Sequence, residues 1–306
     1  MTVPRAVREP PLHHKQNLQL NLETCHNLCR DLATPPGSAR YYSLCFLPKP
    51  QRQALTALYA WQEKLLAIKR ECSDKNVALA KLNWWREETR KLFAGEAQHP
   101  ISKALQEKLG FPDSQAHLRM TSKVDATQIH AQHFYNILNA VESDLTIELY
   151  QTDTELQNFF LQTSGVIEQL SARLLGGQDA TLLEQVRQFG AATQALEHFI
   201  HLRRDLNSHA LYLSAEQLAQ HEVSLDMLYQ KPMPPYVKNL LQAQLGSLQK
   251  KISTSDCAKL LPHCIMLAIQ QKLCTAIVSE NYNVLTQHIR LTPLTMWWCA
   301  AKHFLT

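Results

Sequence analysis

Two histidines and two arginines cluster with one aspartate in a stretch of helical periodicity. His198 and His201 are three residues apart, which places both on one face of a helix, and Arg203, Arg204 and Asp205 follow. A histidine pair can bind zinc, but a zinc site takes roughly four ligands. No second ligand pair with zinc-like spacing appears in the sequence. We therefore expect no metal centre from this cluster.

A second group of potential metal ligands, Cys25, His26 and Cys29, lies near the N-terminus. The chain has eight cysteines, none of them in a Cys-x-x-Cys pair, and most lie in apolar helical patterns. A free cysteine in such a pattern packs as a small hydrophobic side chain. We expect reduced core thiols, which favour a reducing compartment and a cytoplasmic protein.

Composition limits the fold classes that this chain can adopt. Its 306 residues include only 8 glycines, whereas average usage would give about 21. Gly-rich phosphate loops and dinucleotide-binding βαβ units need glycine, and their motifs are absent. The net charge of +4 comes without a basic run of five or more, which argues against a nucleic-acid partner.

Helical periodicity dominates from about residue 17 to the end, without strand alternation, a fixed repeat or a Pro/Ser-rich linker. The sequence predicts one all-α domain over 17–306, preceded by a flexible arm over 1–16. The predicted helical segments are 17–34, 51–72, 75–93, 99–110, 114–149, 154–175, 179–206, 215–220, 234–252, 257–280 and 292–304.

Nine segments, in order along the chain, resemble motifs of the squalene/phytoene synthase family. They are PGSARYYSLCFLP (36–48), RQALTALYAW (52–61), LNWWREE (82–88), LFAG (92–95), QHPI (98–101), SDL (143–145), SGV (164–166), SARLLG (171–176) and RLTPL (290–294), with Tyr212-Leu213 where the family has Y-L-P. The closest resemblance is to the presqualene diphosphate synthases of the hopanoid pathway. The resemblance implies the isoprenoid synthase fold, a single helical bundle around a central cavity, and an ancestral head-to-head joining of two allylic diphosphates.

That ancestral reaction uses Mg²⁺ held by two aspartate-rich motifs, and this chain departs from both. Mg²⁺ prefers several oxygen ligands in an octahedral arrangement. The six family aspartate or glutamate positions hold Leu66, Ala67, Arg70, His201, Arg204 and Asp205. Asp205 is the sole surviving acid, so the resemblance supplies no confident catalytic residue, no metal site and no cofactor. A mitochondrial complex I assembly factor of the same family likewise lacks these aspartates.

The first functional hypothesis is a catalytically degenerate family member. It would bind an isoprenoid, lipid or other anionic ligand, or serve as an assembly or scaffold factor for a protein partner. The ligand-binding candidates are Tyr41, Tyr42, Arg52, Arg70, Arg203, Arg204 and Tyr212. Arginine pairs with phosphate through two parallel hydrogen bonds, which makes anion binding physically reasonable. The alternative for the arginines is that they turn to solvent or form ion pairs.

Two further hypotheses stay open. The chain could be an active prenyl-diphosphate synthase with a rearranged Mg²⁺ site, supported by the retained Tyr41, Tyr42, Arg52, Asp205 and Tyr212; packing could also explain their retention. It could instead contact a membrane peripherally through the aromatic segment 294–305. The competing expectation is that this segment packs on the bundle, as the closing helix of the family would.

Overall fold

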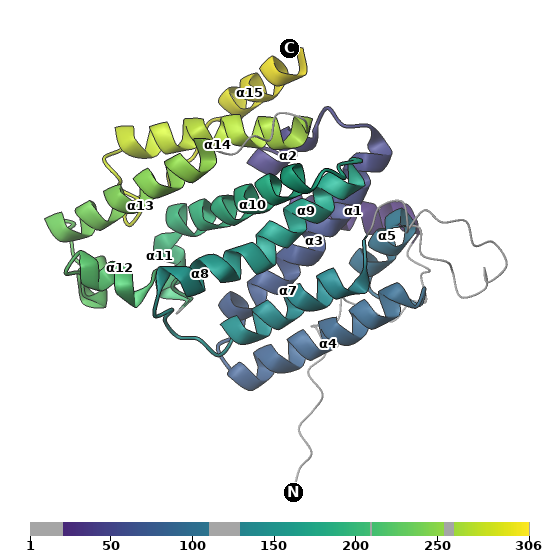
Figure 1. Ribbon diagram of the computed structural model, residues 1–306, viewed down its shortest axis with the longest axis horizontal. Helices are drawn as coiled ribbons and strands as arrows, with labels where there is room; N and C mark the ends of the chain where they lie inside the picture. The colour runs from purple at the N-terminus through teal and green to yellow at the C-terminus, as the bar shows by residue number, and fades with distance from the viewer. Residues whose placement is uncertain (1–20, 110–128, 209, 254–259, 306) are drawn as a thin grey trace, which may run out of the picture.

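The computed structural model describes residues 21–109, 129–208, 210–253 and 260–305 (Figure 1). Within these ranges the chain is helical and contains no β-strand, only an isolated bridge between Tyr150 and Ser214. The predicted all-α class is confirmed. The predicted arm over 1–16, the domain boundary at residue 17 and all of 110–128 lie outside the described residues.

Most of the helices lie within the predicted segments. Their bounds are α1 (Leu22–Ala33), α2 (Ala39–Leu44), α3 (Lys49–Glu71), α4 (Lys75–Phe93), α5 (Pro100–Leu109), α7 (Ala131–Asp144), α8 (Asp153–Phe160), α9 (Val166–Leu174), α10 (Ala180–Ile200), α11 (Leu202–Asn207), α12 (Ala215–Gln220), α13 (Pro235–Ser253), α14 (Leu261–Ser279) and α15 (Pro293–Leu305). A π-helical turn (Leu161–Gly165) joins α8 to α9, and a 3₁₀ turn (Leu225–Tyr229) precedes α13.

Side-chain caps fix where several helices begin. Asn21, Ser38 and Asp74 accept hydrogen bonds from first-turn amides of α1, α2 and α4. Ser214 and Gln217 form a reciprocal capping box at the start of α12. These polar side chains satisfy helix N–H groups that have no partner within the helix.

Four local features differ from the sequence expectation. The six-residue α2 was not predicted, because it is too short to show a helical period. The predicted helix 179–206 breaks at His201 into α10 and α11, and the predicted helix 154–175 contains the π-helical turn. The segment after α7 is irregular from Leu145 to Thr152 rather than helical to residue 149.

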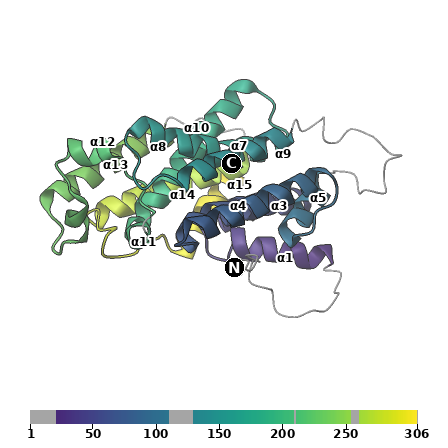
Figure 2. The same ribbon diagram turned by 90° about the horizontal axis from the view of Figure 1, so that it is seen from below.

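The long helices lie side by side, with α3, α7, α9 and α10 in the interior between α4 at one edge and α14 at the other (Figure 1). α3 contacts α1, α5 and α9, and α10 contacts α9 and α13. The view from below shows α1 beneath α3 and α5 (Figure 2). Trp61, Trp85, Phe134 and Phe189 are fully buried and anchor this core.

α14 is long and apolar enough to cross a membrane by length and composition alone, with 19 residues and a mean hydropathy of 1.3. It contacts α2, α13 and α15, and it buries Ile265, Ile269 and Cys274. Interior helices of water-soluble bundles have the same properties, so this helix does not determine whether the protein enters a membrane.

The π-helical turn and α10 approach each other so closely that a side chain cannot fit between them. A Cβ atom at Gly190 of α10 would lie 2.5 Å from the Ser164 carbonyl oxygen and 2.7 Å from Glu168 Cγ. A Cβ at Gly165 would lie 2.9 Å from the Arg187 carbonyl oxygen. Glycine is required at this crossing because the backbones occupy the space of a side chain.

We therefore expect Gly190→Ala to lower the free energy of unfolding by about 1–3 kcal/mol, as overpacking in a rigid core does. Gly246→Ala is the matched control, because it lies in α13 with nothing within 4 Å of its Cβ position. We expect that control to stabilise the protein by up to about 1 kcal/mol. Urea unfolding measures both; equal effects of the two substitutions would contradict the close crossing.

Candidate functional site

The two segments that correspond to the family's metal-binding motifs lie on α3 and at the junction of α10 and α11. Leu66 of α3 packs against the hydrophobic cluster that includes Ala191 of α10 and Tyr212. Glu63 of α3 and Glu197 of α10 are close enough for their charges to interact. The fold thus brings the two segments to a common junction, which we call the α3/α10 junction.

The cations of α3 at this junction are bonded to protein groups. The Arg70 guanidinium lies 3.9 Å from the Glu63 carboxylate. Lys69 Nζ donates hydrogen bonds to Asp144 Oδ1 at 2.8 Å and to the Ile147 carbonyl at 2.9 Å. The Lys69 and Asp144 side chains are only 12% and 3% exposed. Their pair is therefore an internal contact that joins α3 to the end of α7.

Asp144 also accepts the hydroxyl hydrogen bonds of two tyrosines, each at 2.8 Å: Tyr150 to Oδ1 and Tyr212 to Oδ2. Burial and the neighbouring Asp144 carboxylate raise the pKa of Tyr212 well above its ordinary value. Tyr212 therefore stays a neutral donor. Its hydroxyl, which the sequence assigned to ligand binding, is committed to Asp144.

Asp205 is buried and has two partners of its own. Its Oδ2 lies 2.7 Å from His198 Nδ1, and its Oδ1 accepts a 2.9 Å hydrogen bond from Arg204 Nε. The His198 ring in turn packs on the Tyr212 ring, with centroids 3.8 Å apart. The surviving aspartate and Arg204 therefore neutralise each other, as the ion-pair alternative for the arginines expects.

His201 and Glu197 lie on the same side of this junction. His201 Nε2 is 3.6 Å from Glu197 Oε2, and its ring stacks on His288 with centroids 5.1 Å apart. Surrounding protein atoms and the nearby Glu63 carboxylate raise the pKa of Glu197, although its side chain remains accessible to solvent. The α3/α10 junction therefore carries both acidic and basic side chains. It is not uniformly cationic, as Arg70, His201 and Arg204 at the family acid positions would suggest.

A buried polar network lies in the interior between α3, α9 and α14. The Tyr59 hydroxyl donates to Glu168 Oε2 at 2.9 Å, and His263 Nε2 lies 3.0 Å from the same oxygen. The Arg40 guanidinium stacks over the Tyr59 ring at 4.1 Å. Burial alone would raise the pKa of Glu168, but His263, Arg40 and Tyr59 bring it below its ordinary value.

The cavity beside this network is small. It has a volume of about 10 Å³ and is lined by Ser43, Tyr59, Glu168, Phe189, Pro262, His263 and Met266. A space of that size holds about one water molecule. The sequence did not single out Arg40, Glu168 or His263. Only Glu168 left a signal, as a charged residue within the helical run Val166–Leu170.

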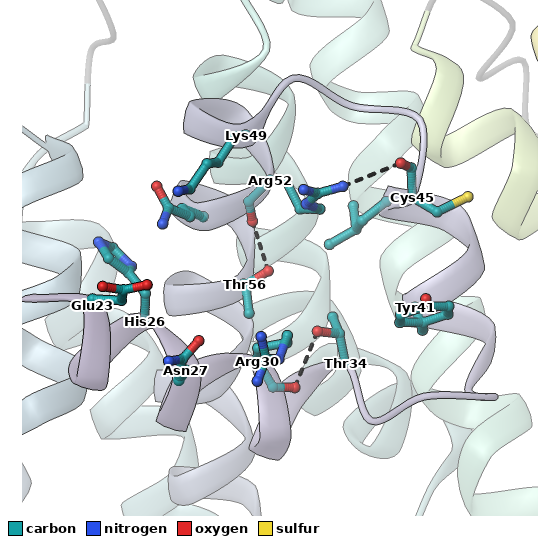
Figure 3. A pocket seen from close by; sticks show the side chains of 12 residues that line it. Glu23, His26, Asn27, Arg30, Thr34, Tyr41, Cys45, Lys49, Arg52 and Thr56 are labelled. Atoms are coloured by element: carbon teal, nitrogen blue, oxygen red, sulfur yellow. Dashed lines mark hydrogen bonds between the residues drawn. The ribbon is translucent and has the colours of Figure 1, made fainter.

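The remaining predicted ligand residues lie elsewhere. Tyr41 and Arg52 line a separate pocket of about 430 Å³ between α1, α2 and α3 (Figure 3). Tyr42 packs against the cluster formed by α14 and α15. The Arg203 guanidinium lies 5.5 Å from the Tyr229 ring centroid. The seven predicted residues therefore do not form one site; three of them, Arg70, Arg204 and Tyr212, belong to the α3/α10 junction.

The donor groups at the α3/α10 junction do not fit Mg²⁺. Among the residues that the structure describes, no group of three or more His, Cys, Asp or Glu side chains is placed to hold a metal ion. Asp205 is bonded to His198 and Arg204, and Arg70 stands where the sequence resemblance implies a carboxylate. A cation in place of a ligand reverses the local charge that a metal ion needs.

The buried environment of His201 makes a prediction about acid stability. Burial and the nearby Arg204 lower the pKa of His201 from 6.5 to about 4. Between these values the unfolded chain binds a proton that the folded protein does not, so the free energy of unfolding falls as the pH falls. We expect His201→Asn to reduce this loss in urea unfolding across that interval. His221→Asn, at the end of α12, controls for the loss of a histidine; equal slopes for His201→Asn and the wild type would contradict the prediction.

Comparisons with known proteins agree with the sequence motifs. The profile of the squalene/phytoene synthase family matches residues 34–295. The chain is 22% identical to a phytoene synthase of Arthrospira platensis over 208 residues, which are 63% of this chain but only 62% of that protein. It is 21% identical to a 15-cis-phytoene synthase of Synechococcus elongatus over 237 residues, or 74% of this chain and 72% of that protein.

Solved structures show the same fold. A ligand complex of a dehydrosqualene synthase superposes with a TM-score of 0.75 at 15% identity, covering 93% of this chain and 96% of that chain. The squalene synthase HpnC from Alicyclobacillus acidocaldarius superposes with a TM-score of 0.64 at 19% identity, covering 86% of this chain and 97% of that chain. The protein therefore has the isoprenoid synthase fold and belongs to the squalene/phytoene synthase family.

Proposed function

We propose that this protein is a catalytically silent member of the squalene/phytoene synthase family that acts by binding. The carrying observation is the bonding of Asp205 at the α3/α10 junction, where His198 and Arg204 occupy both of its carboxylate oxygens, while the Arg70 guanidinium lies 3.9 Å from Glu63. Loss of a diphosphate group produces an anion that metal ions neutralise in this chemistry. The few carboxylates at the α3/α10 junction already have cationic partners, so they lack the capacity to hold metal ions that would neutralise the departing diphosphate.

The buried network supports the same proposal. Arg40, Tyr59, Glu168 and His263 occupy the interior between α3, α9 and α14 with polar groups, and the cavity beside them is about 10 Å³. An isoprenoid chain is apolar and needs a large apolar cavity, because burying polar groups against it leaves their hydrogen bonds unsatisfied. The ligand of the proposed protein is therefore held outside this interior, or is a protein partner.

The competing proposal is an active synthase with a rearranged Mg²⁺ site. Its support is the presence of Tyr41, Tyr42, Arg52, Asp205 and Tyr212 at family positions. Against it, Tyr212 bonds Asp144, Tyr42 packs on α14 and α15, and Tyr41 and Arg52 line the separate pocket.

We expect the purified protein to release no inorganic diphosphate from farnesyl or geranylgeranyl diphosphate in the presence of Mg²⁺, because the metal ligands are missing. The measurement is a diphosphate-release assay with product extraction, and the phytoene synthase of Synechococcus elongatus serves as the positive control. Mg²⁺-dependent formation of presqualene diphosphate, squalene or phytoene would overturn the proposal. In that event Asp205→Asn against the exposed Asp226→Asn would show whether the surviving aspartate carries the activity.

A specific observation favours peripheral membrane contact as a second candidate function. α15 buries Met296, Cys299, Ala300 and Ala301 against the bundle, as the packing expectation proposed. It also exposes five large apolar side chains: Leu294, Trp297, Trp298 (67% exposed), Phe304 and Leu305 (82% exposed). Tryptophan favours membrane interfaces, and a helix lying in an interface uses such a face.

We expect full-length protein to float with anionic liposomes and Trp297→Ser/Trp298→Ser to float several-fold less, because the variant loses the aromatic face but keeps the buried one. Tyr236→Ser is the matched control, since Tyr236 is also half exposed (51%) but lies on α13. Equal flotation of the wild type and the double variant would remove membrane contact through α15.

A further inference from the structure

The pocket between α1, α2 and α3 is separate from the α3/α10 junction and is large enough for a small organic ligand. Its volume is about 430 Å³, within the range of roughly 300–1,000 Å³ that ligand sites occupy. α1 contributes Glu23, His26, Asn27 and Arg30, and the first two turns of α3 contribute Lys49, Arg52, Gln53 and Thr56. Both stripes follow helical spacing, so each helix turns one polar face to the pocket (Figure 3).

The charge of this pocket is unbalanced in favour of cations. Three of its lining side chains are basic, Arg30, Lys49 and Arg52, against one carboxylate, Glu23. Arg30 bonds the adjacent Asp31 at 3.2 Å. Neither Lys49 nor Arg52 has an ion pair with any residue that the structure describes; Arg52 Nη1 donates only to the Cys45 carbonyl, at 3.2 Å. Guanidinium has five donors, so most of those of Arg52 remain available.

The backbone adds positive potential at the same end. α3 is a 23-residue helix whose first turn carries no acidic residue and no side-chain cap. The free N–H groups of a helix N-terminus carry a partial positive charge that favours anions. Lys49 and Arg52 both belong to this first turn, as Figure 3 shows at the upper rim of the pocket. The helix terminus therefore adds positive potential near the end of the pocket that Lys49 and Arg52 line.

The wall of the pocket contains a buried histidine nitrogen without a hydrogen-bond partner, and an apolar patch. His26 is only 9% exposed; its Nε2 lies 2.9 Å from Glu107 Oε2, whereas its buried Nδ1 has no hydrogen-bond partner. Tyr41 and Leu44 supply aromatic and aliphatic surface. Basic side chains beside a partly apolar wall are typical of sites that hold an anionic group attached to a small organic body.

We propose that this pocket binds a phosphate-bearing ligand, with Lys49 and Arg52 as the phosphate contacts. Phosphate matches these side chains because a guanidinium bonds it through two parallel hydrogen bonds and an ammonium supplies further donors. Two sources present the same chemistry, a soluble phosphate ester and a phospholipid head group. The proposal is independent of whether the α3/α10 junction is catalytically silent.

The test uses titration calorimetry of the full chain with inorganic phosphate and with glycerol 3-phosphate at constant ionic strength. We expect binding at millimolar concentration or tighter, and at least a tenfold loss of affinity in Lys49→Gln/Arg52→Gln. Lys75→Gln is the matched control, because Lys75 is also an exposed first residue of a long helix, α4, but lies outside the pocket. That control should bind as the wild type does.

A second variant separates charge from folding. Gln53→Glu adds a carboxylate to the pocket without removing a side chain, so we expect it to abolish phosphate binding while the melting temperature stays at or above the wild-type value. Arg70→Gln shows whether phosphate binds at the α3/α10 junction instead. If this variant weakens phosphate binding and Lys49→Gln/Arg52→Gln does not, the ligand lies at that junction and the proposal fails.

Vesicles distinguish the two sources of phosphate. If phosphatidic acid in phosphatidylcholine vesicles binds the protein and Lys49→Gln/Arg52→Gln removes this binding, the ligand is a lipid head group. If only the binding of glycerol 3-phosphate depends on Lys49 and Arg52, the ligand is a soluble phosphate ester. Absence of binding by all three probes at millimolar concentration, or binding that survives both pocket variants, would overturn the proposal.

Discussion

The buried carboxylate of Asp144 is the contact on which the geometry of the α3/α10 junction depends. It ends α7, receives Lys69 from α3, and accepts the hydroxyl groups of Tyr150 and Tyr212. Removing one partner of a buried charge pair costs about 3–5 kcal/mol, because the remaining charge has no compensation. Asp144 therefore fixes the end of α3 against α7 and against the segment that follows α11, and the side chains at the junction take their positions from this contact.

A metal site holds carboxylates from opposing helices around shared cations. Here the protein supplies its own cations: Lys69 for Asp144, Arg70 for Glu63, and Arg204 with His198 for Asp205. Two of these contacts join different helices: Lys69 of α3 with Asp144 of α7, and His198 of α10 with Asp205 of α11. The carboxylates of this junction are thus partnered by basic side chains of the protein itself.

Much of the fold could be predicted from the sequence because helices leave a local periodic signal. α3, α4 and α12 lie within a residue or two of their predicted bounds, and the absence of β-strands among the described residues matches the scarcity of glycine and strand alternation. α2 could not be found this way, since six residues do not complete two helical turns. The π-helical turn at 161–165 also left no periodic signal, because it depends on the glycine crossing with α10.

The candidate sites were harder to predict because their partners lie far apart in sequence. Lys69 and Tyr212 both bond Asp144, which lies about 70 residues from each in the sequence, so no local pattern could indicate these contacts. Tyr41 and Arg52 are candidates because they match family motifs, and Arg70 because it replaces a motif acid; α3 is long enough to place its first turn in a different pocket from its last. Spacing along one helix therefore predicts shared faces, not shared sites.

The π-helical turn between α8 and α9 also sets the rotation of α9 about its own axis, and therefore which of its side chains face the interior. A π-helical turn takes up about one residue more than an α-helical turn, so it absorbs a residue without changing the direction of the helix. If the same residues continued as a regular α-helix, α9 would be rotated by about 100° relative to α8. Glu168 would then leave Tyr59 and His263, and an apolar residue would take its place in the interior. The polar character of the bundle centre is thus a property of helical register as well as of residue type.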